Sequence, residues 1–576
     1  MANTVGTKAR SVSDALRAFR HQWRGDFRGG LTWWSISALI AVALTVLPLG
    51  AILLGMLGSG SEMWGHLAET LLLVYVGNSI VLMLGVGVLS LVIGLAPAWL
   101  VSVYDFPGRR TFEWALVLPL AIPTYIIAYT YAGIFEYDSL LPSALSTVWP
   151  GMEVWRIRSA VMSREGAMVM MALVLYPYVY VIARASFLRQ SSTVLEMART
   201  LGRGPWDTFL RVALPMSRPA VAGGLTLVLM EVLNEYGAVR YFGVPTFTTG
   251  IFRAWFPLND PIAAMRLSGI LLLFVFTLII FERMQRGRAR FDDGTRGYRP
   301  AVRQKLGGGG RWVATVVCLL PLALGFLVPV SQLVAWAGDA GSGALDARFL
   351  RLILNSFSLA LAAAFIAVSG ALLIGYAVRL SPTPLLRLAS KVSVLGYSIP
   401  GAVVAVGVFG PFVWMDRRLN AFMTAAFDTP TGLLLSGGLA ALIFAYVVRF
   451  LAVALNPIES GFKRLCGNLD DTSRSLGVPP LKTLWKVDLP LLRGTLISAG
   501  LLVFVDVLKE LPLTLILRPF NFDTLATRAF QLATDEQLAR SAVPALLIIV
   551  VGLALAAFAF IGPRRLAVQN FACARP

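Results

Sequence analysis

The chain has 576 residues, of which 57% are hydrophobic and 14% are charged, and its mean hydropathy is +0.73. Soluble domains carry about 25% charged residues, so this composition excludes them and predicts an all-α polytopic membrane protein. The net charge of +19 does not indicate nucleic-acid binding, because the basic residues gather in short segments between long apolar runs, as they do in cytoplasmic loops.

Residues 1–30 form a basic tail that precedes the first apolar run. The tail is polar and arginine-rich, which does not fit a cleavable signal peptide. Leu16, Phe19, Trp23 and Phe27 recur at near-helical spacing. This spacing favours an amphipathic helix on the cytoplasmic leaflet, and a disordered basic tail is the alternative.

Twelve apolar segments follow, each long enough to cross the roughly 30 Å hydrocarbon core of a bilayer as a helix. They lie near 31–57, 72–103, 112–135, 166–188, 219–241, 263–282, 312–337, 352–378, 392–415, 432–455, 494–517 and 541–562. Pro123 and Pro400 fall inside two of these segments and should break or kink the helices. The polar, basic stretch 283–311 carries four consecutive glycines and has the composition of a flexible linker between two sets of six.

Lysine and arginine residues predict the orientation of the chain. The tail, the loop at 104–110, the segment 190–218 and the linker are arginine-rich, and even numbers of crossings separate them, which places all four in the cytoplasm. Asp416-Arg417-Arg418, on the predicted outer side, is an exception. The predicted parts are a cytoplasmic tail (1–30), a first transmembrane domain (31–282), a cytoplasmic linker (283–311), a second transmembrane domain (312–562) and a cytoplasmic C-terminal tail (563–576).

The two sets of six segments are related as a tandem repeat. At an offset of 275 residues, "ARTLGRGPWDTFLRVALP" (198–215) aligns without a gap to "SRSLGVPPLKTLWKVDLP" (473–490), and eight of the 18 positions are identical. Two parallel repeats of about six helices place a pseudo-twofold axis along the membrane normal. We therefore expect a translocation path along that axis.

The repeated stretch predicts a helix, a sharp turn and a second helix. Gly202 can adopt the left-handed conformation that closes a helix, and Pro205 suits the first turn of the next one. We expect Leu214-Pro215 to end this second helix before the next span. The apolar side chains of the stretch must pack on the chain's own helix ends, on a partner, or on both; they are Leu201, Trp206, Phe209 and Val212. A purely structural interfacial helix is the alternative.

Extended to "EMARTLGRGPWDTFLRVALP" (196–215) and "DDTSRSLGVPPLKTLWKVDLP" (470–490), the two stretches resemble the EAA loop of ABC importer permeases. The spacing of that motif is met by Glu196, Gly202 and Leu214 and again by Asp471, Gly477 and Leu489. Four further segments are similar to the fused-dimer permeases of bacterial ferric-iron importers: "LPLAIPTYIIAYTY" (118–131), "LNEYGAVRYFGVPTFTTGIFRAW" (233–255), "LGYSIPGAVVAVGV" (395–408) and "LKELPLTLILRPFNFDTLATRAF" (508–530). The second loop departs from the motif at Asp471-Thr472-Ser473, which puts the strength of its coupling in doubt.

This resemblance implies the type I ABC importer fold and a non-catalytic permease subunit of a bacterial inner membrane. Each loop would dock on one of two copies of a cytoplasmic ATPase, with coupling residues Glu196, Arg199, Gly202, Asp471, Arg474 and Gly477. The ATPases would use ATP and magnesium, and this chain would bind no cofactor. A periplasmic binding protein would deliver ferric iron (Fe³⁺) as the substrate. The absence of a GxxxxGK[ST] motif fits this division of labour.

Four carboxylates lie inside predicted spans: Glu231, Glu235, Asp506 and Glu510. Their i, i+4 spacing predicts one helical face for each pair, at a depth where ionisable groups are costly in lipid. Ferric iron is a hard cation that prefers oxygen ligands, so one interpretation is a transient cation relay that these four residues form. The other is a structural network with Lys509, Arg240 or Asn234, and Lys509 would in either case partly neutralise Asp506.

Two other functions remain open at this point. The same kind of permease could carry thiamine, a polyamine or a phosphonate instead of iron. A secondary transporter needs no ATPase, and the two coupling-type loops and the parallel repeats argue against it. A membrane enzyme is the least favoured class, because the sequence contains no nucleophile–base set and no cysteine or histidine cluster.

Overall fold

The computed structural model describes residues 32–58, 61–136, 154–190, 197–198, 200–286, 303–341, 346–465 and 468–566. The predicted amphipathic helix of the tail, most of the linker, Glu196 and Arg199 lie outside the described residues. The first half contains α2 (Trp33–Met56), α3 (Trp64–Thr70), α4 (Leu72–Val103), β1 (Tyr104–Asp105), α5 (Arg109–Ala115), η1 (Leu118–Ala121), α6 (Thr124–Ile134), α8 (Val154–Val161), α9 (Arg164–Arg189), α11 (Pro205–Thr208), η2 (Phe209–Ala213), α12 (Leu214–Asn234), α13 (Gly237–Tyr241), α14 (Phe247–Trp255) and α15 (Pro261–Arg286).

Apart from β1 and α8, the second half repeats the order of the elements from α4 onward. It contains β2 (Gln304–Lys305), α16 (Gly310–Leu322), η3 (Ala323–Leu327), α17 (Val328–Ala340), α18 (Ala347–Leu380), α19 (Pro384–Ser393), η5 (Val394–Ser398), α20 (Gly401–Phe427), α21 (Leu439–Arg464), α22 (Asn468–Ser475), α23 (Pro480–Thr483), η6 (Leu484–Asp488), α24 (Leu489–Leu508), α25 (Pro512–Leu517), α26 (Leu525–Thr534) and α27 (Leu538–Leu566). The chain is an all-α polytopic membrane protein, as predicted. In the described part of the chain the one sheet is the short parallel pair β1–β2.

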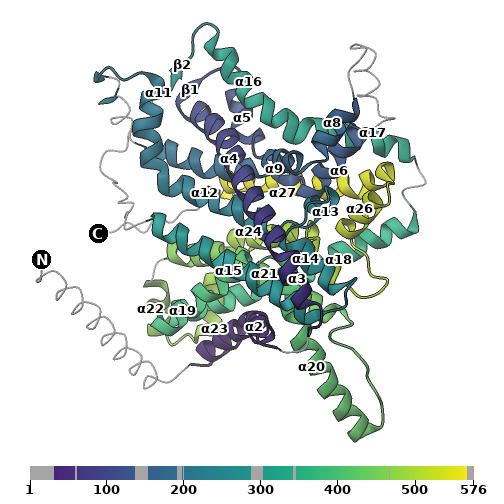
Figure 1. Cartoon of the computed structure of the whole chain (residues 1–576). Coiled ribbons are helices and arrows are strands. Elements are labelled where there is room, and N and C mark those ends of the chain that lie inside the picture. The colour runs from purple at the N-terminus through teal and green to yellow at the C-terminus, as the bar shows by residue number, and fades with distance from the viewer. Residues whose placement is uncertain are drawn as a thin grey trace, which may run out of the picture.

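The membrane-spanning helices agree with the twelve predicted segments. Among the described residues, nine helices are long and apolar enough to cross a bilayer, and two further pairs are bent at a short break. Helix α27 occupies the twelfth segment. Figure 1 shows α11 and α22–α23 at one end of the bundle and α8 and α26 at the opposite end. Both predicted coupling loops therefore lie on the same side.

The two bent pairs confirm the predicted breaks at Pro123 and Pro400. Helix α6 leaves the preceding α5–η1 segment at 90°, and α20 leaves the α19–η5 segment at 114°. The residue before each proline, Ile122 or Ile399, has an extended backbone, because the proline ring disfavours the helical conformation there. Each proline then serves as the N-cap of the next helix. Both breaks lie in the middle of the bundle.

The prediction that Leu214-Pro215 ends a helix is wrong. Helix α12 continues through Pro215, and the preceding turn, η2, has π-helical hydrogen bonding in which the Leu214 N–H donates to the Phe209 carbonyl. The same arrangement recurs where η6 precedes Pro490 and where η3 precedes Pro329. A widened π turn accommodates the proline ring and its missing N–H, which a regular α-helix does not.

The turn predicted before this helix is confirmed in both repeats. Gly202 and Gly477 have φ angles of +77° and +72°, the left-handed conformation that glycine adopts without strain. Pro205 and Pro480 are the first residues of α11 and α23.

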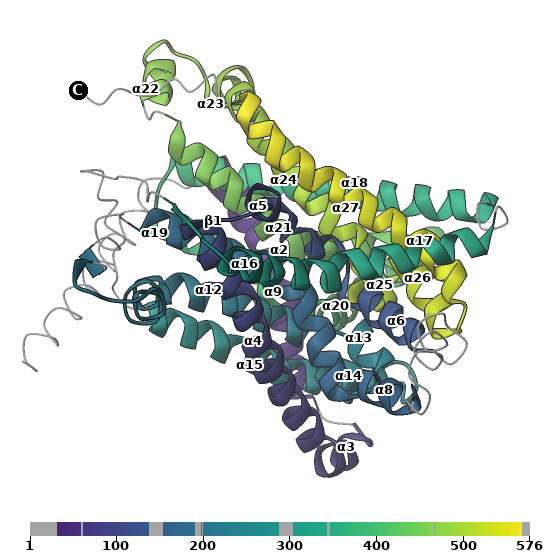
Figure 2. The same cartoon turned by 90° about the horizontal axis from the view of Figure 1, so that it is seen from above.

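The two halves exchange their first helices. Helix α2 packs against α18, α19 and α20 of the second half, and it approaches α20 so closely that a Cβ atom at Gly407 would stand 2.5 Å from the Pro48 carbonyl oxygen. In return, the α16–α17 helix contacts α4, α6 and α9 of the first half, and the Tyr131 hydroxyl donates to the Leu324 carbonyl at 2.6 Å. Figure 2 shows α17 running beside α27 at the edge of the bundle.

Candidate functional site: a cavity between the two halves

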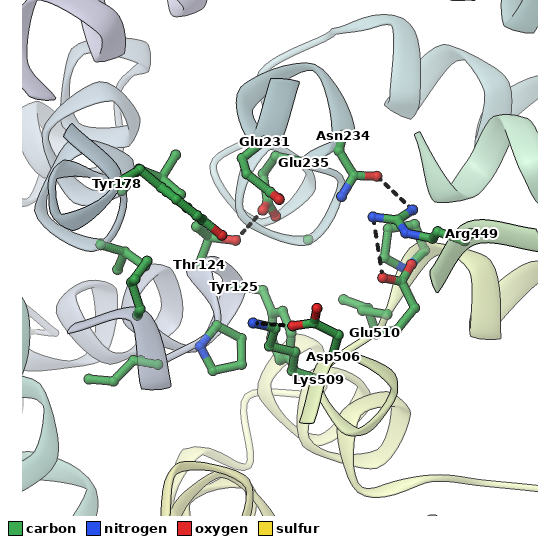
Figure 3. A pocket seen from close by; sticks show the side chains of 18 of the residues that line it. Thr124, Tyr125, Tyr178, Glu231, Asn234, Glu235, Arg449, Asp506, Lys509 and Glu510 are labelled. Carbon is green, nitrogen blue, oxygen red and sulfur yellow. Dashed lines mark hydrogen bonds and ion pairs between the residues drawn. The ribbon is translucent and has the colours of Figure 1, made fainter. Parts of the chain in front are cut away.

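A cavity of about 100 Å³ lies where the two broken helices meet the ends of α12 and α24. Both halves contribute to its wall. The polar residues that line it are Thr124, Tyr125, Tyr178, Glu231, Asn234, Glu235, Tyr397, Arg449, Asp506, Lys509 and Glu510. Figure 3 labels all of them except Tyr397 and shows the labelled side chains converging from the two halves. The four predicted carboxylates therefore line one cavity.

The carboxylates are not arranged as two helical faces, so that part of the prediction is wrong. Helix α12 ends at Asn234, and Glu235 follows with an extended backbone; helix α24 ends at Leu508, two residues before Glu510. Each glutamate instead caps the short helix that follows it. The Ala238 N–H donates to Glu235 Oε1 at 2.8 Å, and the Leu513 N–H donates to Glu510 Oε1 at 3.3 Å. A carboxylate at a helix N-terminus satisfies an otherwise unpaired N–H and interacts favourably with the helix dipole.

The second half neutralises both of its carboxylates. Lys509 Nζ lies 2.8 Å from Asp506 Oδ1, as the sequence suggested. Arg449 Nη2 lies 3.5 Å from Glu510 Oε2, and both side chains of this pair are less than a tenth exposed. The sequence analysis missed Arg449, although a single arginine inside the apolar span of α21 is a recognisable signal of a functional or paired group.

The first half leaves its two carboxylates without a basic partner. Among the ion pairs of the described residues, none includes Glu231 or Glu235. Glu235 accepts a hydrogen bond from the Thr124 hydroxyl, and Glu231 Oε1 lies 3.5 Å from the Tyr397 hydroxyl. Four acids and two bases thus line the cavity, and the unmatched negative charge belongs to the first half. Such a cavity attracts cations and repels anions.

Asn234 joins the halves across the cavity. Its side-chain oxygen accepts hydrogen bonds from the Gly401 N–H at 2.8 Å and from Arg449 Nη1 at 3.0 Å. A Cβ atom at Gly401 would stand 2.2 Å from Arg449 Nη1 and 2.5 Å from Glu510 Oε1, so a side chain here would displace this ion pair. The contact connects the end of α12 to the break before α20.

The carboxylates alone do not form a preformed metal site. Within the described ranges, no group of three histidine, cysteine, aspartate or glutamate side chains is placed to hold a metal ion. The other side-chain oxygens that line the cavity are the amide oxygen of Asn234 and the hydroxyl groups of Thr124, Tyr125, Tyr178 and Tyr397. The sequence analysis did not select these hydroxyl residues, because single tyrosines in apolar helices are common as packing residues.

The two helix–turn–helix loops expose apolar side chains at equivalent positions. Leu201 and its counterpart Leu476 are 80% and 75% exposed, and Trp206 and its counterpart Leu481 are 77% and 55% exposed. Phe209 packs instead on the chain's own helix ends, with its ring near those of Trp99 and Phe187. Of the apolar residues predicted to pack on the chain or on a partner, Phe209 therefore packs on the chain itself, whereas Leu201 and Trp206 face outward. Asp471 and Arg474 are exposed on α22, and Gly202 and Gly477 form the turns.

Different contacts tie the two loops to their halves. In the first, Gln190 Nε2 donates to the Ala213 carbonyl at 2.9 Å. In the second, Arg379 pairs with Asp470 at 2.7 Å, and the Tyr376 hydroxyl donates to the Pro480 carbonyl at 2.7 Å. Asp488, the counterpart of Ala213, is fully buried, and neither of its carboxylate oxygens has a hydrogen-bond partner.

Comparison with known proteins places both repeats in one family. The model of the family "Binding-protein-dependent transport system inner membrane component" matches residues 90–290 and again 371–568. The chain is 25% identical over 478 residues to the Fe(3+)-transport system permease protein FbpB 2 of Haemophilus influenzae, covering 82% of this chain and 86% of that protein. It is 24% identical over 504 residues to the ferric transport system permease protein FbpB of Actinobacillus pleuropneumoniae, covering 82% of this chain and 70% of that one. It is also 26% identical to the sulfate transport system permease protein CysT of Escherichia coli, over 36% of this chain and 72% of that protein.

Proposed function

The chain belongs to the binding-protein-dependent transport system inner membrane component family, whose model matches both of its halves, and on that premise we propose that it carries ferric iron through the bacterial inner membrane. It is a permease component of an ABC importer. Both tails would lie in the cytoplasm, and a periplasmic binding protein would deliver the iron to the opposite end of the bundle.

The acidic cavity between the halves is the observation that carries this proposal. Its carboxylates outnumber its bases by four to two, and hard cations bind preferentially to oxygen. The two ferric relatives match over most of this chain, whereas the sulfate relative covers only about a third of it. Sulfate is an anion, and two unmatched carboxylates disfavour it. Glu231, Glu235, Asp506 and Glu510 would form the cation path.

The exposed apolar residues of the two loops support docking of two ATPase copies. Such residues on short cytoplasmic loops have no core in which to be buried, and exposed apolar patches of this kind mark interaction surfaces. The coupling residues would be Glu196, Arg199, Gly202, Asp471, Arg474 and Gly477. ATP and magnesium would be bound by the ATPases, which close and draw the loops together. The broken helices beside the cavity would then rearrange and open the path alternately to each side.

A polyamine is the second candidate cargo, because the same unmatched carboxylates would bind an organic cation. Thiamine is a further cationic alternative, and a phosphonate fits the cavity charge poorly. The cavity is small, with room for an ion and a few waters rather than a large solute.

Uptake measurements test the cargo directly. Cells lacking the chain and cells carrying it are given radiolabelled ferric iron, with excess unlabelled polyamine or thiamine as competitor. We expect iron uptake only in the cells that carry the chain, and no competition by either organic cation. Polyamine uptake that depends on the chain, without iron uptake, would replace iron with the second candidate.

A further inference from the structure

Helix α20 is longer than its place in the bundle requires. It starts at Gly401, beside Arg449 and the cavity, and ends at Phe427, a length of about 40 Å. The next helix, α21, starts at Leu439 and reaches the level of the cavity at Arg449, after about ten residues or roughly 15 Å. Helix α20 therefore exceeds the length of the return path, and Figure 1 shows its C-terminal part projecting from the side of the bundle.

The projecting part is the helical arm of a hairpin, which we define as residues 411–439 and call the α20 hairpin. Asp416 is fully buried, and its two carboxylate oxygens accept hydrogen bonds from the Leu435 N–H at 2.8 Å and the Ser436 N–H at 2.7 Å. The Asn420 side-chain oxygen accepts two more from backbone N–H groups, at 2.8 and 3.1 Å. These contacts hold the returning segment along the helix, so the hairpin presents a defined surface.

Apolar side chains are exposed on both arms of the α20 hairpin. Those that are more than half exposed are Trp414, Phe422 and Phe427 on the helix and Leu433 and Leu434 on the returning segment. A projection that displays this many large apolar side chains marks a surface of contact with a membrane or with another protein.

Two arginines lie within this apolar surface. Arg417 and Arg418 are exposed, and the Arg418 Cζ atom lies 5.5 Å from the centre of the Trp414 ring. Among the ion pairs of the described residues, neither arginine has a carboxylate partner. The one exposed acid of the hairpin is Asp428. Tryptophan and long basic side chains beside apolar ones are typical of the boundary between a bilayer and water.

We propose that the α20 hairpin lies in the interfacial layer of the bilayer, with its apolar side chains among the acyl chains and with Arg417 and Arg418 bound to the phosphates of anionic phospholipids. Arginine pairs well with phosphate oxygens. Helix α21 runs from the hairpin to the second coupling loop, so the leaflet concerned is the one on the far side from the loops. Binding to anionic lipid explains why two arginines lie on the predicted outer side, where basic residues are less frequent.

The position of the α20 hairpin favours lipid over a protein partner. A protein that delivers cargo to the cavity would sit over α8 and α26, which lie at the end of the bundle opposite the coupling loops (Figure 1). The hairpin leaves the bundle sideways instead, where the bilayer surrounds the spans. The inference therefore does not depend on which cargo the chain carries.

The first test measures whether the hairpin lies in lipid. A spin label is attached at Phe422→Cys in the full-length chain, after its three native cysteines have been replaced by alanine. The chain is placed in nanodiscs of phosphatidylcholine and phosphatidylglycerol in equal parts. Collisions with oxygen, which concentrates in lipid, are compared with collisions with a water-soluble nickel chelate.

Two further labels calibrate this measurement. A label at Leu84→Cys, on the exposed apolar side of α4, should collide mainly with oxygen, and a label at Asp471→Cys, exposed on α22, mainly with nickel. We expect the Phe422 label to behave like the Leu84 label. Leu433→Cys, on the returning segment, gives the same measurement if the Phe422 variant does not fold.

The second test concerns the charge of the lipid. With Arg417→Gln and Arg418→Gln combined, the ratio of oxygen to nickel collisions at the Phe422 label should fall at least about twofold, because each arginine near an anionic surface contributes to binding. Nanodiscs of phosphatidylcholine alone should lower the ratio in the same way while both arginines are present. The matched control, Arg417→Lys with Arg418→Lys, keeps the positive charge and should keep most of the ratio.

Three outcomes would overturn the inference. The first is a Phe422 label that collides with nickel as often as the Asp471 label does, which would place the hairpin in water. The second is a ratio that is unaffected by phosphatidylglycerol and by the glutamine substitutions, because the arginines would then bind no anionic lipid. The third is a label that is exposed to water until a binding protein is added, which would assign the hairpin to that protein.

Discussion

The two halves share a fold but treat the same carboxylates differently. Asp506 and Glu510 have Lys509 and Arg449 beside them. At the equivalent positions, the hydrogen-bond partners of the Glu231 and Glu235 carboxylates among the described residues are two hydroxyls and one backbone N–H. The two copies of a duplicated membrane domain can therefore keep the same breaks in their helices while the charged side chains beside those breaks become different. One wall of the cavity has become neutral, and the other retains the negative charge.

Among the changes that test this difference between the halves, removal of Arg449 is expected to have the largest effect, and the quantity affected is the stability of the chain. Arg449→Met leaves Glu510 buried without its cation, which costs about 3–5 kcal/mol for a buried pair. The midpoint temperature of thermal unfolding of the purified chain should therefore fall strongly. Lys509→Met is the matched control, because the Lys509–Asp506 pair is more exposed, and its loss should be much smaller. An equal loss in the two variants would contradict the distinction between the pairs.

The next largest effect is expected in the two predicted coupling loops. Trp206 and its counterpart Leu481 are both exposed, and buried tryptophans are the strongest anchors of interfaces. Trp206→Ala should weaken binding of the ATPase by about 2 kcal/mol, roughly thirtyfold, and Leu481→Ala by less. The measurement is the affinity of the ATPase for the chain in lipid nanodiscs. A larger loss of affinity for Leu481→Ala would show that the second loop contributes more to ATPase binding than the first.

Neutralising the first-half acids should lower transport rather than stability. Glu231→Gln removes unmatched negative charge without breaking an ion pair, and iron uptake should fall roughly tenfold, equivalent to about 1.4 kcal/mol. The amount of chain in the membrane should remain unchanged. Glu69→Gln, which makes the same change on the exposed surface of α3, is the control. Normal uptake by the Glu231 variant would favour the purely structural network.

The smallest effect is expected at the base of the second loop. Asp488 is buried without a hydrogen-bond partner, and the first half has Ala213 at this position. Asp488→Ala removes a desolvated carboxylate and should raise the free energy of unfolding by about 1 kcal/mol, measured from the thermal unfolding of the purified chain. Ala213→Asp should lower it. A drop in stability for Asp488→Ala would show that the carboxylate has a partner in the assembled transporter.

Local backbone chemistry made much of this fold predictable. Pro123 and Pro400 break their helices, and Gly202 and Gly477 form left-handed turns, because these residues restrict or permit particular backbone angles. The continuation of α12 through Pro215 was not predictable in this way, because it depends on a π turn that the surrounding packing supports.

The site was predictable only as a set of residue types. Intramembrane carboxylates identified the cavity, but their roles depend on where helices end. Glu235 lies past the end of α12 and became a helix cap, which no periodicity argument reveals. Arg449 and Tyr178 come from spans distant in the sequence, and only the three-dimensional fold brings them into one cavity with Glu510 and Glu231.

The exchange of first helices has a consequence for how the protein is made. Because α2 completes the wall of the second half and α16–α17 that of the first, neither half is a finished bundle by itself. Newly synthesised α2 can pack on α15 of its own half, but its contacts with α18, α19 and α20 form only after the helices of the second half have been inserted. A gene cut within the linker should yield working transporter only when both pieces are produced together in the same membrane.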